Sequence, residues 1–184
     1  AQPARPAQPA RVVELWTFDE HRIGLHAVLG SVWAPKGKQP IAVVQDKYEW
    51  LYLYAFVQPQ TGQTWWYILP ELSTRAFKLV LHDFAKTLRV GPKKTVILQM
   101  DNAPWHTSSN LKVPKGILPI FQPPYSPELQ PAERLWQLTD EPIKNRSFDT
   151  LQQLQDVLSL RCVELQAQQQ QVKALTLFNW WPLI

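Results

Sequence analysis

Cysteine is almost absent from this chain, because Cys162 is the one cysteine among 184 residues. A lone cysteine cannot close a disulfide within the chain, which excludes a disulfide-built scaffold and indicates a reducing compartment. The sequence also lacks Cys clusters, a His-x-x-x-His pair, a glycine-rich phosphate loop and a Gly-x-Ser-x-Gly turn, so it offers no common zinc, P-loop or hydrolase site. No apolar run reaches the roughly 18 residues of a membrane span, and no secretory leader is recognisable. We therefore expect a cytoplasmic protein without a membrane partner.

Methionine is scarce too, since Met100 is the only one and the chain begins at Ala1. We therefore expect a fragment, a processed product or a partial reading frame. Residues 1–11 contain three prolines and no apolar periodicity. This composition predicts an extended linker to an upstream part of the protein.

Apolar and aromatic residues, in contrast, are abundant. Hydrophobic residues make up 45 % of the chain and nine residues are tryptophan, which predicts one folded domain with a sizeable core. The net charge is +4, which is compatible with a nucleic-acid partner but also occurs in many proteins that bind none. We assign the domain to residues 12–165 and a C-terminal tail to residues 166–184.

Strand signals dominate the first part of the domain. β-Branched and aromatic side chains predict five strands before any helix, which suggests an antiparallel meander. The five predicted strands cover residues 12–18, 23–33, 41–45, 50–57 and 64–69.

Helix signals follow later in the chain. The first predicted helix is capped by Ser73 or Thr74, the second begins at Pro131, and the third is capped by Ser147. Cys162 lies on the apolar stripe of the third helix, so we interpret it as a packing residue.

Two short predicted strands, residues 95–100 and 117–121, lie between the first two helices. The order of elements therefore predicts a mixed α/β layer. The glutamines at 166 and 168–171 predict a solvated end to the last helix.

Asp101 directly follows the strand at 95–100, and active sites of open α/β sheets gather at the carboxyl ends of strands. The alternative is an Asx turn or a helix cap, which is the commoner role of an isolated aspartate after a strand. Asn102 and His106 follow closely and supply polar groups that suit a metal or phosphate site.

Two further acids are candidates. Glu133 lies in the first turn of the second helix, where the alternative is a residue that favours the helix dipole or closes a capping box. Glu128, in the turn just before, is a rival. Asp19 closes the first strand, and the adjacent Glu20 points to the opposite face, so only one of them can share a site with Asp101. We choose Asp19, with a solvated strand end as the alternative.

Three carboxylates supply the oxygen ligands that Mg²⁺ prefers, and two ions about 3.5–4 Å apart can serve phosphodiester transfer. Four lysines in predicted turns could contact DNA phosphates, or simply form a solubilising surface: Lys36, Lys38, Lys112 and Lys115. Trp105 could stack on an unpaired base or belong to the core.

Three motifs resemble the catalytic domain of mariner-like DDE transposases, in their bacterial insertion-sequence branch. They are Phe18-Asp19-Glu20, then Asp101-Asn102-Ala103 with His106, then Pro124-Tyr125-Ser126-Pro127-Glu128-Leu129-Gln130-Pro131-Ala132-Glu133-Arg134-Leu135-Trp136. The third motif is the most specific, and the resemblance covers roughly residues 12–162. Nothing in the chain matches the N-terminal helix-turn-helix region of that family.

The resemblance implies an α/β, RNase H-like fold, with a mixed five-stranded sheet flanked by helices. It implies that Asp19, Asp101 and Glu133 are catalytic and bind two Mg²⁺ ions, with Mn²⁺ able to substitute, whereas Glu128 is not a ligand. The implied partners are DNA, as element ends and target, and a second copy of the chain on that DNA. The implied location is cytoplasmic, with the nucleoid.

The resulting hypothesis is a DDE-type polynucleotidyl transferase, which cleaves DNA at insertion-sequence ends and transfers the cut strand. One alternative is a non-catalytic, truncated transposase remnant that binds DNA or the full-length transposase. Another is a related RNase H-like nuclease.

Overall fold

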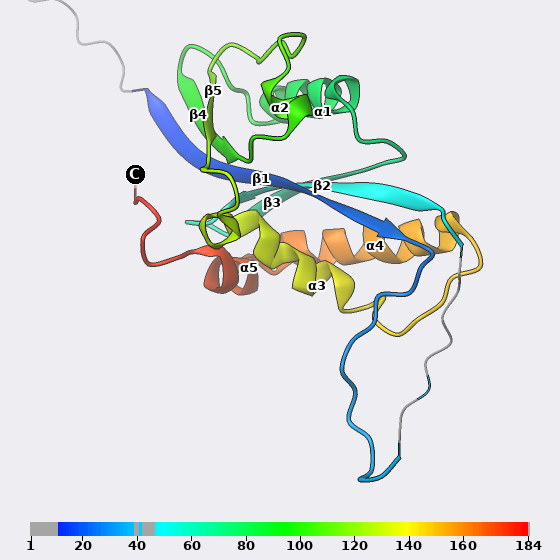
Figure 1. Cartoon of the computed structure of the whole chain (residues 1–184). Helices are drawn as coiled ribbons and strands as arrows, with labels where there is room; N and C mark the ends of the chain where they lie inside the picture. Colours follow the sequence, from blue (N-terminus) through cyan, green and yellow to red (C-terminus); the bar gives the residue numbers. More distant parts are fainter. Residues whose placement is uncertain (1–10, 39–40, 42–46, 184) are drawn as a thin grey trace, which may run out of the picture.

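The computed structural model describes residues 11–38, 41 and 47–183. Its centre is a five-stranded sheet in the order β3-β2-β1-β4-β5 (Figure 1). The antiparallel half joins β1 (Val12–Gly24), β2 (Trp50–Gln58) and β3 (Gln63–Leu69). The parallel half joins β1 to β4 (Lys94–Met100) and β4 to β5 (Ile117–Phe121). The predicted mixed five-stranded sheet is confirmed.

The prediction of a separate strand over residues 23–33 is wrong. β1 continues to Gly24, which pairs with Trp50, and the chain then leaves the sheet. Leu29 and Trp33 have no sheet face to cover and are exposed, at 62 % and 104 %. Of the predicted strand at 41–45, all but Ile41 lies outside the described residues. Three strands therefore precede the first helix in the described part of the chain.

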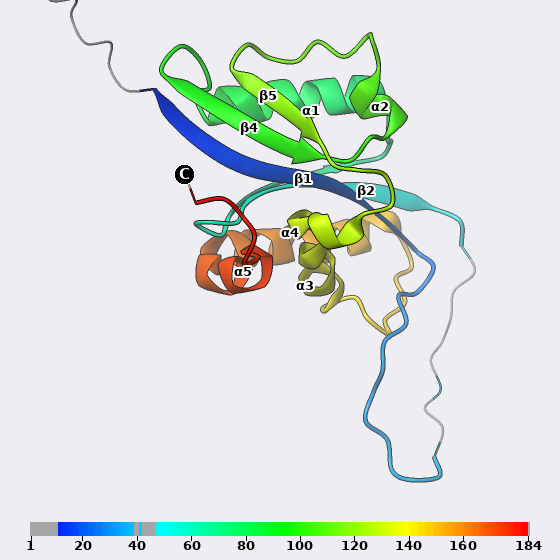
Figure 2. The ribbon, with the colours of Figure 1, turned by 60° about the vertical axis from the view of Figure 1, so that its left-hand side comes forward.

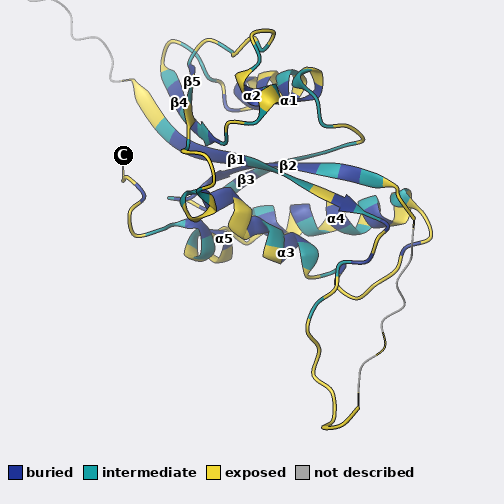
Figure 3. Ribbon diagram, viewed as in Figure 1, coloured by how far each residue is buried: buried dark blue, intermediate teal, exposed yellow. Residues whose placement is uncertain are grey.

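The helices form two layers, one on each face of the sheet (Figures 1 and 2). One face is covered by α1 (Thr74–Thr87) and the short α2 (Pro104–Thr107). The opposite face is covered by α3 (Trp136–Asp140), α4 (Leu151–Ala167) and α5 (Gln169–Thr176). Burial follows these layers, with the central strands dark blue between them in Figure 3.

The first layer is built by the periodicity of α1. The Ser73 hydroxyl accepts from the Ala76 amide at 3.1 Å, which confirms the predicted cap. Phe77 and Phe84 point inward and are fully buried, and Phe84 stacks on Phe56 of β2 with 3.9 Å between ring centroids. Burying each such ring contributes about 1.5–3 kcal/mol.

The segment that bears Glu133 is not one α-helix, as the sequence predicted. A short 3₁₀ turn at Pro127–Leu129 is followed by a 3₁₀ helix, Pro131–Leu135, and only then by α3. The Trp136 amide donates to the Glu133 carbonyl, three residues back, which gives this stretch its tighter winding.

The last predicted helix begins later than expected. Thr150, not Ser147, caps α4, because its side chain accepts from the Gln153 amide at 3.3 Å. Asn145 adopts a left-handed φ of 57°, so the chain is still turning just before Ser147. Cys162 is buried on the inner stripe of α4, and burial raises the pKa of its thiol to about 12. The interpretation of Cys162 as a packing residue is confirmed.

The prediction that the glutamine-rich segment is solvated is confirmed, because residues 168–171 are exposed. The segment is not simply the end of α4, however, since residues 169–176 form a separate helix, α5, that packs on the sheet. Val172 and Thr176 are fully buried. The β2–β3 turn lies against the start of α5 so closely that a Cβ on Gly62 would lie 1.9 Å from the Gln169 carbonyl oxygen. The domain boundaries drawn from the sequence stay a prediction. None of the helices in the described residues is long and apolar enough to cross a membrane.

β5 is the open edge of the parallel half. The Gly116 carbonyl and the Gln122 amide both hydrogen-bond to β4, so the residues alternate and Pro119 turns its nitrogen away from β4. Leu118 and Ile120 on this strand are about half exposed, at 53 % and 51 %.

Candidate active site

Asp19 and Asp101 lie level with each other because β1 and β4 are parallel neighbours. Thr17 pairs with Gln99, and each aspartate lies two residues further along its chain. A step of two residues keeps a side chain on the same face of a sheet. β4 ends at Met100, so Asp101 stands where its strand ends and Asp19 stands beside that end. The sequence prediction for Asp101 at a strand end is confirmed.

Hydrogen bonds between Gln130 and β1 hold the segment that bears Glu133 near this part of the sheet. The Gln130 side chain is only 1 % exposed. Its Oε1 accepts from the Thr17 hydroxyl, and its Nε2 donates to the Phe18 carbonyl at 3.0 Å. These bonds fix the start of the 3₁₀ helix on β1, and Glu133 follows three residues later.

His106 connects Asp101 to Glu20. Its Nδ1 lies 2.7 Å from Asp101 Oδ1 and its Nε2 lies 2.9 Å from Glu20 Oε1. The imidazole is 1 % exposed and packs on the Phe18 and Phe77 rings. Burial alone would lower the pKa of His106, but the hydrogen bonds that its ring donates to Asp101 and Glu20 raise it to about 9. At neutral pH the ring is therefore an imidazolium between two carboxylates.

This arrangement keeps Asp101 ionised. The hydrogen bond from His106 lowers the pKa of Asp101 below its usual value, against the effect of partial burial. The Ala103 amide donates to the same Oδ1 at 3.0 Å. The second carboxylate oxygen stays available, because the Asp101 side chain is 45 % exposed.

Asp19 has the opposite electrostatic character. Burial raises the pKa of its carboxyl to about 8, and the neighbouring charges of Glu20 and Glu133 act in the same direction. Two hydrogen bonds oppose this shift: Trp136 Nε1 donates to Asp19 Oδ2 at 2.9 Å, and the Glu20 amide donates to the same carboxylate. Without a cation nearby, Asp19 therefore carries a proton at neutral pH for most of the time.

Glu133 is exposed on its 3₁₀ helix. Its pKa is raised, first by desolvation and also by the charge of Asp101, while the adjacent Arg134 lowers it. Glu133 thus lies within electrostatic range of both aspartates, since it also raises the pKa of Asp19.

Three acids that repel one another are a suitable donor set for a hard divalent cation, because the cation removes the repulsion. In the part of the chain that the structure describes, however, no three His, Cys, Asp or Glu side chains are grouped closely enough to hold one ion as they stand. Binding would therefore require the carboxylates to turn toward one another.

The predicted supporting residues lie in different places. Asn102 donates to the Gln122 carbonyl at 2.6 Å, so its amide faces the chain beyond β5 rather than Asp101. Trp105 is partly buried against the core, and its Nε1 donates to Glu20 at 3.1 Å. Its packing and this bond favour the core interpretation of Trp105 over base stacking.

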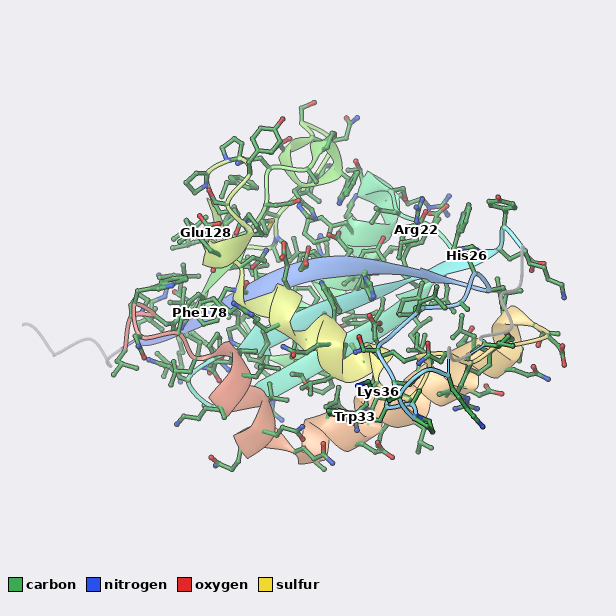
Figure 4. All side chains as sticks on the ribbon, turned by 60° about the horizontal axis from the view of Figure 1, so that its bottom comes forward. Arg22, His26, Trp33, Lys36, Glu128 and Phe178 are labelled. Atoms are coloured by element: carbon green, nitrogen blue, oxygen red, sulfur yellow. The ribbon has the colours of Figure 1, made fainter. Side chains whose placement is uncertain are left out.

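The predicted DNA-contacting lysines form two separate groups. Lys36 and Lys38 lie on the long connection between β1 and β2, which extends away from the sheet in Figure 1. Figure 4 labels Lys36 beside Trp33 on this connection. Lys112 and Lys115 are exposed in the connection from α2 to β5. Lys115 precedes Gly116, whose carbonyl accepts from the Val96 amide, so it lies near the start of β4, at the opposite end of that strand from Asp101.

Sequence reasoning missed three residues that shape the site. Glu20 was set aside as the acid on the wrong face, yet that face is where His106 meets it. Gln130 and Trp136 appeared only as letters of the third motif. The even spacing of Gln130, Glu133 and Trp136 was the available signal, because residues three apart share one face of a 3₁₀ helix.

Comparisons with known proteins agree with this arrangement. Residues 14–155 match the family described as DDE superfamily endonuclease. An insertion element IS630 39 kDa protein of Shigella sonnei is 32 % identical over 141 residues, which cover 74 % of this chain and 40 % of the relative. A protein of Sinorhizobium fredii, y4pE/y4sA, is 37 % identical over 100 residues, 54 % of this chain and 73 % of its own length.

The fold matches that of solved transposases. A Mos1 mariner paired-end complex with Mn has a TM-score of 0.60 at 15 % identity, and a pre-cleavage Mos1 transpososome one of 0.59 at 14 %. Each comparison covers 88 % of this chain and 55 % of the transposase, so the chain spans about half the length of those proteins. The predicted RNase H-like class is thereby confirmed. The chain belongs to the DDE superfamily of endonucleases.

Proposed function

We propose that this chain carries the catalytic site of an insertion-sequence transposase, which cleaves DNA strands at the element ends and transfers them to target DNA. The observation that carries the proposal is that Asp19 and Asp101 lie level on neighbouring parallel strands, with Glu133 near enough for its charge to raise the pKa of Asp19 and for the charge of Asp101 to raise its own. Carboxylates that repel one another are useful at one site only if a bound cation offsets their repulsion.

The proposed metal ligands are Asp19, Asp101 and Glu133, and the proposed ions are two Mg²⁺, with Mn²⁺ able to substitute. Ions bound there would supply positive charge that activates a water or a 3′-hydroxyl and stabilises the leaving oxygen. The oxygen donors of these three acids fit a hard ion, and the exposed Glu133 side chain would turn toward the aspartates on binding.

The chain's own residues have distinct tasks in this proposal. Asp101 is held ionised by the His106 imidazolium and presents its second oxygen to the site. Asp19 gives up its proton when a cation arrives. Glu133 is exposed and turns toward the other two acids. No covalent bond to the protein forms, because water or the 3′-hydroxyl attacks phosphorus and the bridging 3′ oxygen leaves.

The proposed partners are DNA and a second copy of the chain. The proposed phosphate contacts are the exposed Lys36, Lys38, Lys112 and Lys115; Lys115 lies near the start of β4, so it would meet DNA away from Asp101 rather than beside the cut. Mos1, the structural neighbour, is solved as a paired-end complex, which supports assembly of two copies on two ends. The proposed location is the cytoplasm, with the nucleoid.

A direct test is nicking of supercoiled plasmid DNA carrying element ends, with Mg²⁺ or Mn²⁺, by the full chain alone or fused to a DNA-binding domain. The proposal expects Asp101→Asn, Asp19→Asn and Glu133→Gln each to lower nicking by at least about 10³-fold, because each removes a ligand. Asp156→Asn, an exposed change on α4, is the matched control.

Three outcomes would contradict the proposal. Full nicking by Asp101→Asn would mean that the site lies elsewhere. DNA binding by the wild-type chain without metal-dependent nicking would instead indicate the non-catalytic remnant. Faster cleavage of branched or hybrid substrates than of element ends would indicate the RNase H-like nuclease.

A further inference from the structure

Gln130, Glu133 and Trp136 follow one another at intervals of three residues across the 3₁₀ helix and the start of α3. At three residues per turn such positions lie on the same face. That face lies over β1, because Gln130 bonds to Thr17 and Phe18 and Trp136 bonds to Asp19. Glu133 therefore lies between Gln130 and Trp136 on this face, and both of these residues are hydrogen-bonded to β1, the strand that bears Asp19.

The Trp136 side chain is itself held from two directions. Its indole stacks on the His21 ring of β1, with 5.0 Å between centroids and 20° between planes. His21 Nε2 lies 3.0 Å from Asp140 Oδ1, at the other end of α3. The indole N–H is thus aimed at Asp19 Oδ2 by contacts on both elements, and it occupies one oxygen of that carboxylate.

Glu133 has no such support of its own. No hydrogen bond or ion pair to its carboxylate is found among the described residues, and its side chain is exposed. The position of Glu133 relative to Asp19 is therefore set by its backbone. Hydrogen bonds of Gln130 and Trp136 hold that backbone on β1.

We propose that Gln130 and Trp136 are positioning residues, which hold Glu133 at a fixed place beside β1 and orient the Asp19 carboxylate before a metal ion binds. The inference rests on the proposed function, because it assigns both acids to one metal site. Its chemical consequence is preorganisation: the fold, rather than the incoming ion, provides part of the ordering of the ligands.

The competing explanation is that both residues only stabilise the fold. Trp136→Phe separates the two, since it keeps an aromatic ring on His21 and removes only the donor to Asp19. Trp65→Phe is the matched control, because the buried Trp65 Nε1 has no hydrogen-bond partner in the described structure. Gln130→Met keeps the side-chain volume and removes both hydrogen bonds to β1, so it tests the positioning role of Gln130.

The experiment measures plasmid nicking by the full chain as a function of Mn²⁺, together with thermal unfolding midpoints. We expect Trp136→Phe to raise the Mn²⁺ concentration for half-maximal nicking about tenfold to a hundredfold, the effect of one hydrogen bond to a charged group. At saturating Mn²⁺ its rate should stay within about threefold of wild type, because excess metal offsets lost preorganisation. Trp65→Phe should change neither value.

Two readouts do not depend on activity. Calorimetric titration of Mn²⁺ into DNA-free protein should show the same loss of affinity in Trp136→Phe and a similar loss in Gln130→Met. The Trp136 indole N–H resonance, identified as the one missing from Trp136→Phe, should move when Mg²⁺ is added, whereas the Trp65 resonance should not.

The outcomes are distinguishable. If the wild-type chain neither binds Mn²⁺ nor nicks DNA, the proposed function fails and this inference fails with it. If the wild-type chain does both and Trp136→Phe matches Trp65→Phe in Mn²⁺ affinity, only the positioning role is overturned. A loss of Mn²⁺ affinity that merely parallels the decrease in thermal unfolding midpoint among the variants would overturn the positioning role as well.

Discussion

The His106 ring and the Asp101 carboxylate are joined by a 2.7 Å hydrogen bond, and the far side of the same ring lies 2.9 Å from Glu20. Replacing His106 by alanine should destabilise the fold by about 3–5 kcal/mol, because Glu20, at 6 % exposure, would be left as a buried charge without its partner. Urea unfolding measures this loss.

The same replacement should lower metal-dependent nicking about 10- to 100-fold, the usual effect of removing a group that orients a metal ligand. Glu20→Gln is the control, since it keeps an acceptor for His106 and leaves Asp101 untouched. If Glu20→Gln abolished nicking as completely as Asp19→Asn, Glu20 would be a ligand rather than a support.

Stability without metal should fall as the pH rises from about 6.5 to 9. The folded pKa of His106, about 9, is above its unfolded value of about 6.5, so its contribution is complete below pH 6.5 and lost through pH 9. Asp19 acts in the same direction, because its folded pKa of about 8 also exceeds the unfolded value. Urea unfolding at several pH values measures the slope, and Asp19→Asn should reduce it. A stability that rises over this range would contradict both shifts.

Metal affinity should rise with pH up to about 8. A cation must displace the proton on Asp19, so the affinity should change by up to about tenfold per pH unit below that value and level off above it. Calorimetry of Mn²⁺ binding in buffers of different ionisation enthalpy counts the released proton. Asp19→Asn should bind weakly at every pH, and a pH-independent affinity in the wild type would exclude Asp19 as a ligand.

Gly62→Ala should loosen α5 from the sheet. Gly62 has a φ of +77°, and a Cβ there would collide with the Gln169 carbonyl, so a loss of more than about 2 kcal/mol is expected. Gly37→Ala is the control, because its φ is +84° but nothing lies within 4 Å of the new Cβ. It should lose about 1 kcal/mol by strain alone. If urea unfolding showed equal losses of unfolding free energy for Gly62→Ala and Gly37→Ala, the contact of the β2–β3 turn with α5 would not contribute to stability.

Local patterns explain which parts of the fold were predictable. α1 and β4 were recognised because a cap and an apolar period lie within one short stretch of sequence. Residues 23–33 were mistaken for a strand because the apolar residues in the second half of the segment, such as Leu29 and Trp33, are exposed, and periodicity does not report burial. The segment at Pro131 was recognised as helical, but its 3₁₀ winding was not.

The candidate site was predictable only in part. Asp101 follows from its strand, whereas Glu133 was selected through the family motif, since spacing alone favoured a helix-start residue. The contacts that organise the acids join residues 86 positions apart, for His106 and Glu20, and 117 apart, for Trp136 and Asp19. Such pairs depend on strand register and helix placement, which local patterns in a single sequence do not predict.

Pro119 has a consequence for how copies of this protein can associate. On an open edge strand, the outward amides are what a foreign strand would bind. Along β5 those amides belong to residues 117, 119 and 121: the first already donates to the Pro114 carbonyl, and the second has no hydrogen to donate. A continuous intermolecular sheet through β5 is therefore interrupted at its centre, although the strand carries apolar side chains that invite aggregation. Two copies working on one DNA molecule would have to meet through another surface.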